Sequence, residues 1–162
     1  MSDIGKSEKT TQKRLLGLFK DELGYRYLGD WTDRSNSNIE ESLLTEYLTG
    51  ASYSGAHISA ALFKLRAEAH NTHRSLYDNN QAVYSLLRYG VDGQVQAGKP
   101  TDKVKLINWS EPGKNIFAIV EEVTLKGGFE RRPDLVLYVN GIAIAVIELK
   151  NSRVSLGDGI RQ

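Results

Sequence analysis

Residues 131–151 read RRPDLVLYVNGIAIAVIELKN and form the longest apolar run of the chain, with charged residues only at its two ends. Residues 135–139 and 142–147 are rich in Val, Ile, Leu and Tyr, a composition that is typical of β-strands. Neither segment alternates with polar residues, so we expect both strands to be buried on both faces. The dipeptide Asn140-Gly141 between them predicts a hairpin turn.

The predicted hairpin brings three charged residues to one edge of a sheet. Asp134 precedes the first strand, and Glu148 and Lys150 follow the second. Glu148 and Lys150 are two residues apart, so their side chains project on the same face while Leu149 points into the core. Charges at the edge of a buried sheet are costly unless they are paired. A divalent cation such as Mg²⁺ explains the carboxylates, and the ammonium can polarise its water or steady a phosphate under attack. The pattern therefore predicts phosphodiester hydrolysis.

The register of the hairpin decides whether the two carboxylates meet. A two-residue loop sets Asp134 opposite Ile147 and places Glu148 on the other face. A three-residue loop sets Asp134 opposite Val146 and brings both acids to one face as diagonal neighbours. We therefore predict a three-residue loop, with Gly141 in the left-handed conformation as a G1 bulge. A two-residue loop with no compensating bulge near the start of the first strand would contradict the metal site.

The motif resembles that of a known nuclease superfamily. The pattern P-D, a spacer and E-L-K is similar to the PD-(D/E)xK motif, and RPDLVLYVNGIAIAVIELKNS closely resembles the nuclease segment of the restriction (R) subunit of type I restriction enzymes. The blocks EKTTQ, LGYRYLG, NIEE, SLYDNN, VYSLLRYGV and LINW extend the likeness over nearly all of residues 8–162. The resemblance implies an α/β (α+β) fold with a restriction-endonuclease-like core, in which helices flank a mixed central sheet. It also implies Mg²⁺-dependent cleavage of double-stranded DNA, for which Mn²⁺ can substitute.

The resemblance implies roles for individual residues as well. Asp134 and Glu148 would bind Mg²⁺, the backbone carbonyl of Leu149 would complete the coordination, and Lys150 would activate or orient the attacking water. A carboxylate on the first helix often assists in nucleases of this fold, and Glu8 is the best candidate for it. The alternative for Glu8 is a solvated acid at a helix start, which the helix dipole favours.

Contacts with DNA are assigned to three further residues. Gln162 matches the glutamine that opens a Q-x-x-x-Y element in the family, where it contacts DNA or organises the site; an ordinary glutamine at a helix start is the alternative. Arg132 and Arg153 belong to local basic clusters that could touch phosphates. The chain as a whole is nearly neutral, with 21 Lys and Arg against 20 Asp and Glu. A free-standing DNA-binding protein is usually basic, so we expect other parts of an assembly to deliver the DNA.

The expected partners follow from the same resemblance. They are the modification and specificity subunits and the motor domains of the full-length subunit, whose ATP-driven translocation controls cutting in the family. This chain has no G-x-x-x-x-G-K-[ST] loop, so no ATP site is expected in it. We expect the isolated chain to be weakly active or inactive.

Bulk properties bound the class of protein. The length of 162 residues predicts one domain at 11–162 after a polar tail at 1–10. The last residues carry no terminating signal, so we expect a fragment of a longer chain. A hydrophobic content of 40% and a charged content of 25% are ordinary for a soluble protein. There is no apolar run that could span a membrane and no signal peptide. The absence of cysteine excludes disulfides and fits a cytoplasmic protein.

The hydrophobic period predicts helices first and strands afterwards. We expect helices at 11–23, from a capping box at Asn38 to Gly50, at 56–70 and from 78 or 79 to 89. We expect an aromatic connector at 25–31, and strands at 91–95, 104–109 and 116–125 in addition to the hairpin. Gly24 is well placed to end the first helix.

Several features have competing interpretations. His70 and His73 are three residues apart and could share a metal ion, although an exposed helix end explains them better. Trp31, Trp109 and the eight tyrosines could stack on bases, although most are expected in or beside the core. Two other functions stay open. One is a stand-alone repair or resolvase-type nuclease of the same fold, which a strongly basic face and activity without ATP would favour. The other is a non-catalytic DNA-binding or docking module, which failure to bind metal would favour.

Overall fold

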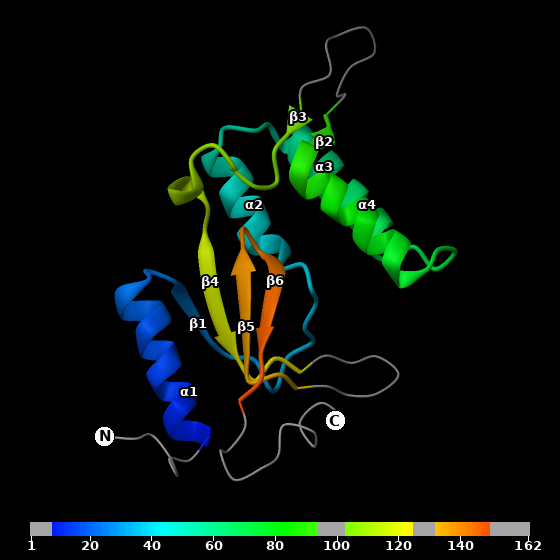
Figure 1. The fold of residues 1–162 in the computed structure, drawn as a ribbon. Coiled ribbons are helices and arrows are strands. Elements are labelled where there is room, and N and C mark those ends of the chain that lie inside the picture. The colour runs from blue at the N-terminus through cyan, green and yellow to red at the C-terminus, as the bar shows by residue number, and fades with distance from the viewer. Residues whose placement is uncertain (1–7, 94–102, 125–131, 150–162) are drawn as a thin grey trace, which may run out of the picture. The chain divides into compact units, whose positions relative to one another are not determined.

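The computed structural model describes residues 8–93, 103–124 and 132–149, and Figure 1 shows the path of the chain. The chain divides into two compact units. The first combines Met1–Asn38 with Phe117–Gln162, and the second is Ile39–Ile116. The predicted catalytic hairpin and the first helix belong to the same unit, although they stand at opposite ends of the sequence.

The first unit combines a helical segment with a mixed four-stranded sheet. The helical segment is α1 (Glu8–Gly17), which continues into the π-helical turn η1 (Leu18–Glu22). The strands stand in the order β1 (Arg26–Asp30), β4 (Phe117–Glu121), β5 (Leu135–Val139) and β6 (Ile142–Ile147). β1 is parallel to β4, and the other neighbouring pairs are antiparallel. Together with the four α-helices in the described part of the chain, this mixed sheet confirms the predicted α+β class.

One face of the sheet packs on this helical segment. A cluster of buried side chains on β4 and β5 contacts three apolar residues of the helix, namely Ile119, Leu135 and Leu137 against Leu15, Leu16 and Phe19. Full burial of one such side chain stabilises a fold by about 1.5–3 kcal/mol, so this cluster anchors the helix. Gly24 follows the segment with a φ of 71° and ends it, as predicted.

The segment after Gly24 differs from its prediction. Residues 25–31 were expected to form an aromatic connector, but Arg26–Asp30 is strand β1, in which Arg26 pairs with Ala118. β1 is an edge strand of the described sheet, and it contains Gly29 and ends on an aspartate. Both residue types are depleted in strands, so local composition conceals a strand that is formed by pairing with a distant segment.

The second unit is mainly helical. It contains α2 (Glu41–Gly50), α3 (Gly55–Ala69), α4 (Leu76–Tyr89), the two-stranded sheet of β2 (Val91–Asp92) and β3 (Lys103–Val104), and the 3₁₀ turn η2 (Pro112–Lys114). The side chain of Ser75 accepts a hydrogen bond from the N–H of Asp78 and caps α4, which therefore begins earlier than predicted. None of the helices in the described part of the chain is long and apolar enough to cross a membrane.

Two local predictions for the middle of the chain are wrong. Asn38 does not cap α2: the N-cap is Glu40, which makes no side-chain capping bond. The carbonyl of Asn38 accepts a hydrogen bond from the N–H of Ala143 at 2.9 Å, and this contact holds Asn38 to β6. The strand predicted at 104–109 ends at Val104. Beyond it, the N–H of Asn108 bonds to Asn115 Oδ1 at 2.8 Å, so a side chain replaces the partner strand.

The β5–β6 hairpin turns through two residues and contains a bulge. Val139 pairs with Ile142, and the loop residues Asn140 and Gly141 have φ values of 50° and 80°. Two consecutive positive φ values define the type I′ turn that Asn-Gly favours, so the predicted three-residue loop is wrong. Tyr138 pairs with Ala143, but Leu137 pairs with Ala145, which leaves Ile144 as one extra residue on β6.

The two strands of the hairpin differ in burial. Every residue of β5 is buried, as predicted. β6 alternates instead: Ile144 and Val146 are 51% and 58% exposed, so the prediction of burial on both faces is wrong for this strand. β6 is the last strand of the described sheet, whereas β5 lies between two neighbours. Apolar composition alone does not distinguish an inner strand from an edge strand.

The turn assignment makes a prediction for Gly141. A side chain in the left-handed region costs about 1–2 kcal/mol, so we expect Gly141→Ala to lower the free energy of unfolding by that amount in urea denaturation. Gly50→Ala is the matched control, because an added Cβ there meets no atom within 4 Å and the φ is not left-handed. We expect the control to be neutral or stabilising. Equal stability of the two variants would contradict the turn.

Candidate functional site

Asp134 and Glu148 lie at the same end of the sheet. β4 and β6 end there and β5 begins there, because β5 is antiparallel to both neighbours (Figure 1). Leu135 pairs with Ile147, so continuing the ladder by one position sets Asp134 directly opposite Glu148. Residues opposite each other project on one face, with Cβ atoms about 4.5–5.5 Å apart. The two acids therefore share the face opposite to that of Leu135 and Ile147.

The bulge at Ile144 is what brings the two acids to one face. A two-residue turn alone would set Asp134 opposite Ile147 and put Glu148 on the other face. The extra residue shifts the register by one, from Tyr138 paired with Ala143 to Leu137 paired with Ala145. The predicted three-residue loop is absent, and a bulge midway along β6, not one near the start of β5, produces the register that brings the acids together.

Backbone contacts from both neighbouring strands hold Asp134. Its Oδ2 accepts a hydrogen bond from the N–H of Leu149 at 2.5 Å. Its carbonyl accepts one from the N–H of Glu122 at 3.0 Å. Asp134 is half-buried and Glu148 is exposed. A carboxylate has about four lone-pair positions, so the bond to Leu149 leaves Asp134 able to accept a cation.

A second pair of acids, Glu121 and Glu122, ends β4 beside Asp134. Gln12 of α1 is only 7% exposed, and its Nε2 donates to Glu121 Oε2 at 3.1 Å and to Glu122 Oε1 at 3.4 Å. The Nε of Arg132 pairs with Glu122 Oε2 at 3.1 Å. Glu122 has a left-handed φ of 55°, a strained conformation that costs about 1–3 kcal/mol for a residue with a side chain. This network offsets the strain and ties α1 to the strand end beside Asp134.

The sequence reasoning missed Gln12, Glu121 and Glu122. Two adjacent glutamates interrupt the apolar segment IFAIVEEV, and that interruption was a usable signal for a strand that ends at a polar site. Gln12 closes the EKTTQ block but carries no chemistry of its own. Its role depends on a contact between residues more than a hundred positions apart, which composition does not reveal.

Only some of the other predicted site residues lie in the described part of the chain. Lys150, Arg153 and Gln162 lie outside the described residues. Arg132 is exposed and pairs with Glu122, so its contact with DNA stays a prediction. Glu8 is the first residue of α1, which packs on the face of the sheet opposite to the two acids. Within residues 8–93, 103–124 and 132–149, no group of three or more His, Cys, Asp or Glu side chains could hold a metal ion.

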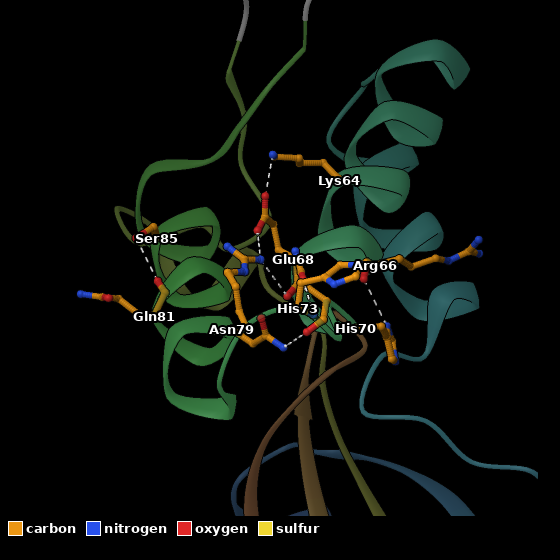
Figure 2. Close-up of polar contacts among 10 residues, drawn as sticks. Lys64, Arg66, Glu68, His70, His73, Asn79, Gln81 and Ser85 are labelled. Carbon is orange, nitrogen blue, oxygen red and sulfur yellow. Dashed lines mark hydrogen bonds and ion pairs between the residues drawn. The ribbon is translucent and has the colours of Figure 1, made fainter.

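His70 and His73 are held by local contacts at the end of α3. Figure 2 shows them among the polar side chains between α3 and α4. His70 Nδ1 lies 3.2 Å from the carbonyl oxygen of Arg66, and the N–H of His73 donates to Asn71 Oδ1 at 2.9 Å. Among the described residues no third metal ligand joins this pair. The structure gives these histidines contacts that fit the end of a helix.

The donor set of Asp134 and Glu148 fits a hard divalent cation. Mg²⁺ takes oxygen ligands and is commonly bound by one or two carboxylates while it keeps several waters. The two acids supply one carboxylate each from adjacent strands, on one face of the sheet. Glu148 is exposed, so its carboxylate is accessible from solvent.

Tyr27 makes this end of the sheet sensitive to alkali. Burial, together with its hydrogen bond to Glu121 and the charge of that residue, raises the pKa of Tyr27 from 10.0 to about 12. Stability from a raised pKa is complete below the unfolded-state value and is lost as the pH rises through the folded-state value. We therefore predict that between pH 10 and 12 the free energy of unfolding falls more steeply for the wild type than for Tyr27→Phe. Urea denaturation at several pH values tests this, and identical pH profiles would contradict it.

Comparisons with known proteins place the chain in a family. A family model described as type I restriction enzyme R protein N terminus matches residues 5–162. The chain is 37% identical over 76 residues to the type I restriction enzyme HindI endonuclease subunit of Haemophilus influenzae. This match covers 44% of the chain and 7% of that protein. It is 32% identical over 134 residues to the putative type I restriction enzyme MjaVIIIP endonuclease subunit of Methanocaldococcus jannaschii. This match covers 79% of the chain and 13% of that protein.

These figures describe a short chain beside long relatives. The matched segments span 7% and 13% of the two relatives' lengths, whereas the family model spans nearly all of this chain. The relatives are named as endonuclease subunits, and the acids that meet at the end of β5 and β6 lie within the residues that the family model matches. The chain belongs to the family of type I restriction enzyme R protein N-terminal domains.

Proposed function

We propose that this chain is the endonuclease domain of a type I restriction enzyme and hydrolyses phosphodiester bonds of double-stranded DNA with Mg²⁺. The observation that carries the proposal is the bulged register that sets Asp134 opposite Glu148 in a chain of this family. The two similar subunits described above carry the word endonuclease in their names, which supports the same activity for this chain.

Each residue has a distinct part in the proposed reaction. Asp134 and Glu148 would hold the cation, and the carbonyl of Leu149, whose own N–H donates to Asp134, would be a further oxygen donor. A cation bound there supplies Lewis-acid chemistry: it acidifies water and neutralises charge on the phosphate. Lys150 stands two residues after Glu148, and on a continued strand its ammonium projects on the same face. There it orients the attacking water and donates to the phosphate.

The proposed activity depends on partners that this chain does not supply. The net charge of +1 provides little general attraction for DNA. We propose that ATP-driven motor domains, with the modification and specificity subunits, bring double-stranded DNA to the site. Arg132, Arg153 and Gln162 are the proposed DNA contacts within the chain.

Calorimetric titration of Mn²⁺ tests the metal site without requiring DNA cleavage. We predict that the wild type binds Mn²⁺ and that Asp134→Asn and Glu148→Gln each weaken binding about tenfold or more, because each removes a charged ligand. Asp134→Asn keeps an oxygen that can accept the N–H of Leu149, so it removes charge with little change of shape. Asp21→Asn is the matched control, since its carboxylate is 67% exposed on η1, outside the site. Undiminished binding by both site variants would overturn the proposal and favour a non-catalytic module.

Lys150→Ala separates binding from chemistry. We predict that this variant keeps its Mn²⁺ affinity within about twofold, since an ammonium is not a metal ligand. DNA cleavage by the assembled enzyme should fall by about 10²-fold or more, which is the usual contribution of a positioned group that acts on a proton in the reaction. Cleavage at the wild-type rate would remove Lys150 from the proposed mechanism.

A further inference from the structure

Among the described residues of the second unit, two basic side chains have no recorded acidic partner. Its described residues, 39–93 and 103–116, contain seven Lys and Arg residues. Five of them pair with a carboxylate, namely Lys64, Arg66, Arg74, Lys103 and Lys114. The structure records no carboxylate partner for the other two, Arg88 and Lys105. Unmatched cations within one small region attract anions.

Both unmatched cations line the same hollow. This pocket has a volume of about 210 Å³ and is lined by residues 87–90, Lys105, Ile107, Trp109 and Ser110. No acidic residue is among them. The volume is small for a drug-sized ligand and suits one planar ring with an attached anion.

The pocket also presents exposed aromatic surface. Trp109 is 50% exposed and Tyr89 is 68% exposed. The indole Nε1 of Trp109 donates to the carbonyl of Leu87 at 2.8 Å, which fixes the ring, and the guanidinium of Arg88 lies 5.6 Å from the ring centroid. Aromatic rings and guanidinium planes are the surfaces on which unpaired bases stack.

Gly90 holds the two sides of the pocket together. It has a φ of 82° and joins α4, which carries Arg88, to the small sheet from which Lys105 follows. A Cβ at this position would stand 2.9 Å from the carbonyl oxygen of Val104. The close approach of the two backbones therefore requires glycine, and it sets the spacing of the two cations.

The exposed aromatic surface continues along α4. Tyr77 and Tyr84 are 74% and 59% exposed and lie seven residues apart, so they occupy one side of the helix about 10 Å from each other. Arg88 is four residues beyond Tyr84 on the same side. A single nucleotide would fill only the pocket, whereas this row of side chains suits several successive nucleotides.

We infer that the second unit binds single-stranded DNA, with one base stacked on Trp109, phosphates at Arg88 and Lys105, and neighbouring nucleotides along Tyr84 and Tyr77. A duplex keeps its bases stacked on one another and offers only phosphates to such a surface. The site is therefore selective for unpaired DNA. This inference rests on the proposed function, in which DNA is the substrate. The binding site itself lies in the other unit and shares no residue with the carboxylate site.

Fluorescence anisotropy of a labelled thymidine oligonucleotide tests the inference at low salt. We expect the double variant Arg88→Glu, Lys105→Glu to weaken binding about tenfold or more. The slope of log affinity against log salt concentration should become shallower by about 1.4, which corresponds to the loss of two phosphate contacts on a single strand. The control is Lys64→Glu with Lys114→Glu, which changes the charge equally at side chains outside the pocket that are 52% and 65% exposed. Equal weakening by both double variants would overturn the site, as would no binding by the wild type.

Substitutions of Trp109 test the stacking. Trp109→Leu should weaken binding about fivefold or more, which corresponds to one lost base stack, while Trp109→Phe should keep most of the affinity. Circular dichroism confirms that each variant is folded. Equal affinities of the Leu and Phe variants would overturn the stacking role. If thymidine monophosphate competes as well as the unlabelled oligonucleotide, the single-strand assignment is overturned and the ligand of the pocket is a free nucleotide.

Asp134→Asn separates this inference from the proposed function. We expect it to bind the oligonucleotide as the wild type does. If Mn²⁺ binding fails while strand binding persists, only the proposed nuclease site is lost. If strand binding depends on Asp134 rather than on Arg88 and Lys105, the second site is overturned.

Discussion

The period of two along a β-strand is the constraint on which the candidate site depends. A shift of one residue in the pairing of β5 and β6 moves a side chain to the opposite face of the sheet. The Asn-Gly dipeptide selects a two-residue turn, because its backbone twist suits the strands that it joins. That turn alone would separate the two acids. The extra residue at Ile144 restores the register, so the turn and the bulge together define the site.

Two backbone irregularities of the first unit bear directly on this site. They are the positive φ of Glu122, which contacts Asp134, and the bulge on β6, which sets the register of the two acids. Such conformations persist only where surrounding contacts hold them, and here Gln12 and Arg132 provide the contacts for Glu122. Because Gln12 belongs to α1, the beginning of the chain stabilises the end of β4, which contacts Asp134 through the backbone.

The sequence was sufficient for the features that depend on local pattern. The hairpin, the three middle helices and the α+β class follow from hydrophobic period and from the Asn-Gly signal. Three features depend on distant partners and were not predictable. Strand β1 forms by pairing with β4, and β6 has a bulge at Ile144. Asn38 does not cap α2, whose N-cap is Glu40. The same limit applies to the site. Asp134 and Glu148 were found from their motif, whereas Gln12 and the glutamates of β4 become visible only when the chain is folded.

The exposed apolar side chains of β6 affect the tendency of the chain to self-associate in concentrated solution. Among the described strands β6 stands at the end of the sheet, with Ile144 and Val146 both more than half exposed. An edge strand with apolar side chains is a template for pairing with another molecule, and natural proteins usually protect such edges with charge, proline or a bulge. β6 has the bulge, and its first charged residue is Glu148 just beyond the strand. The carboxylate proposed as a metal ligand therefore also acts as a gatekeeper against aggregation, and neutralising it favours self-association.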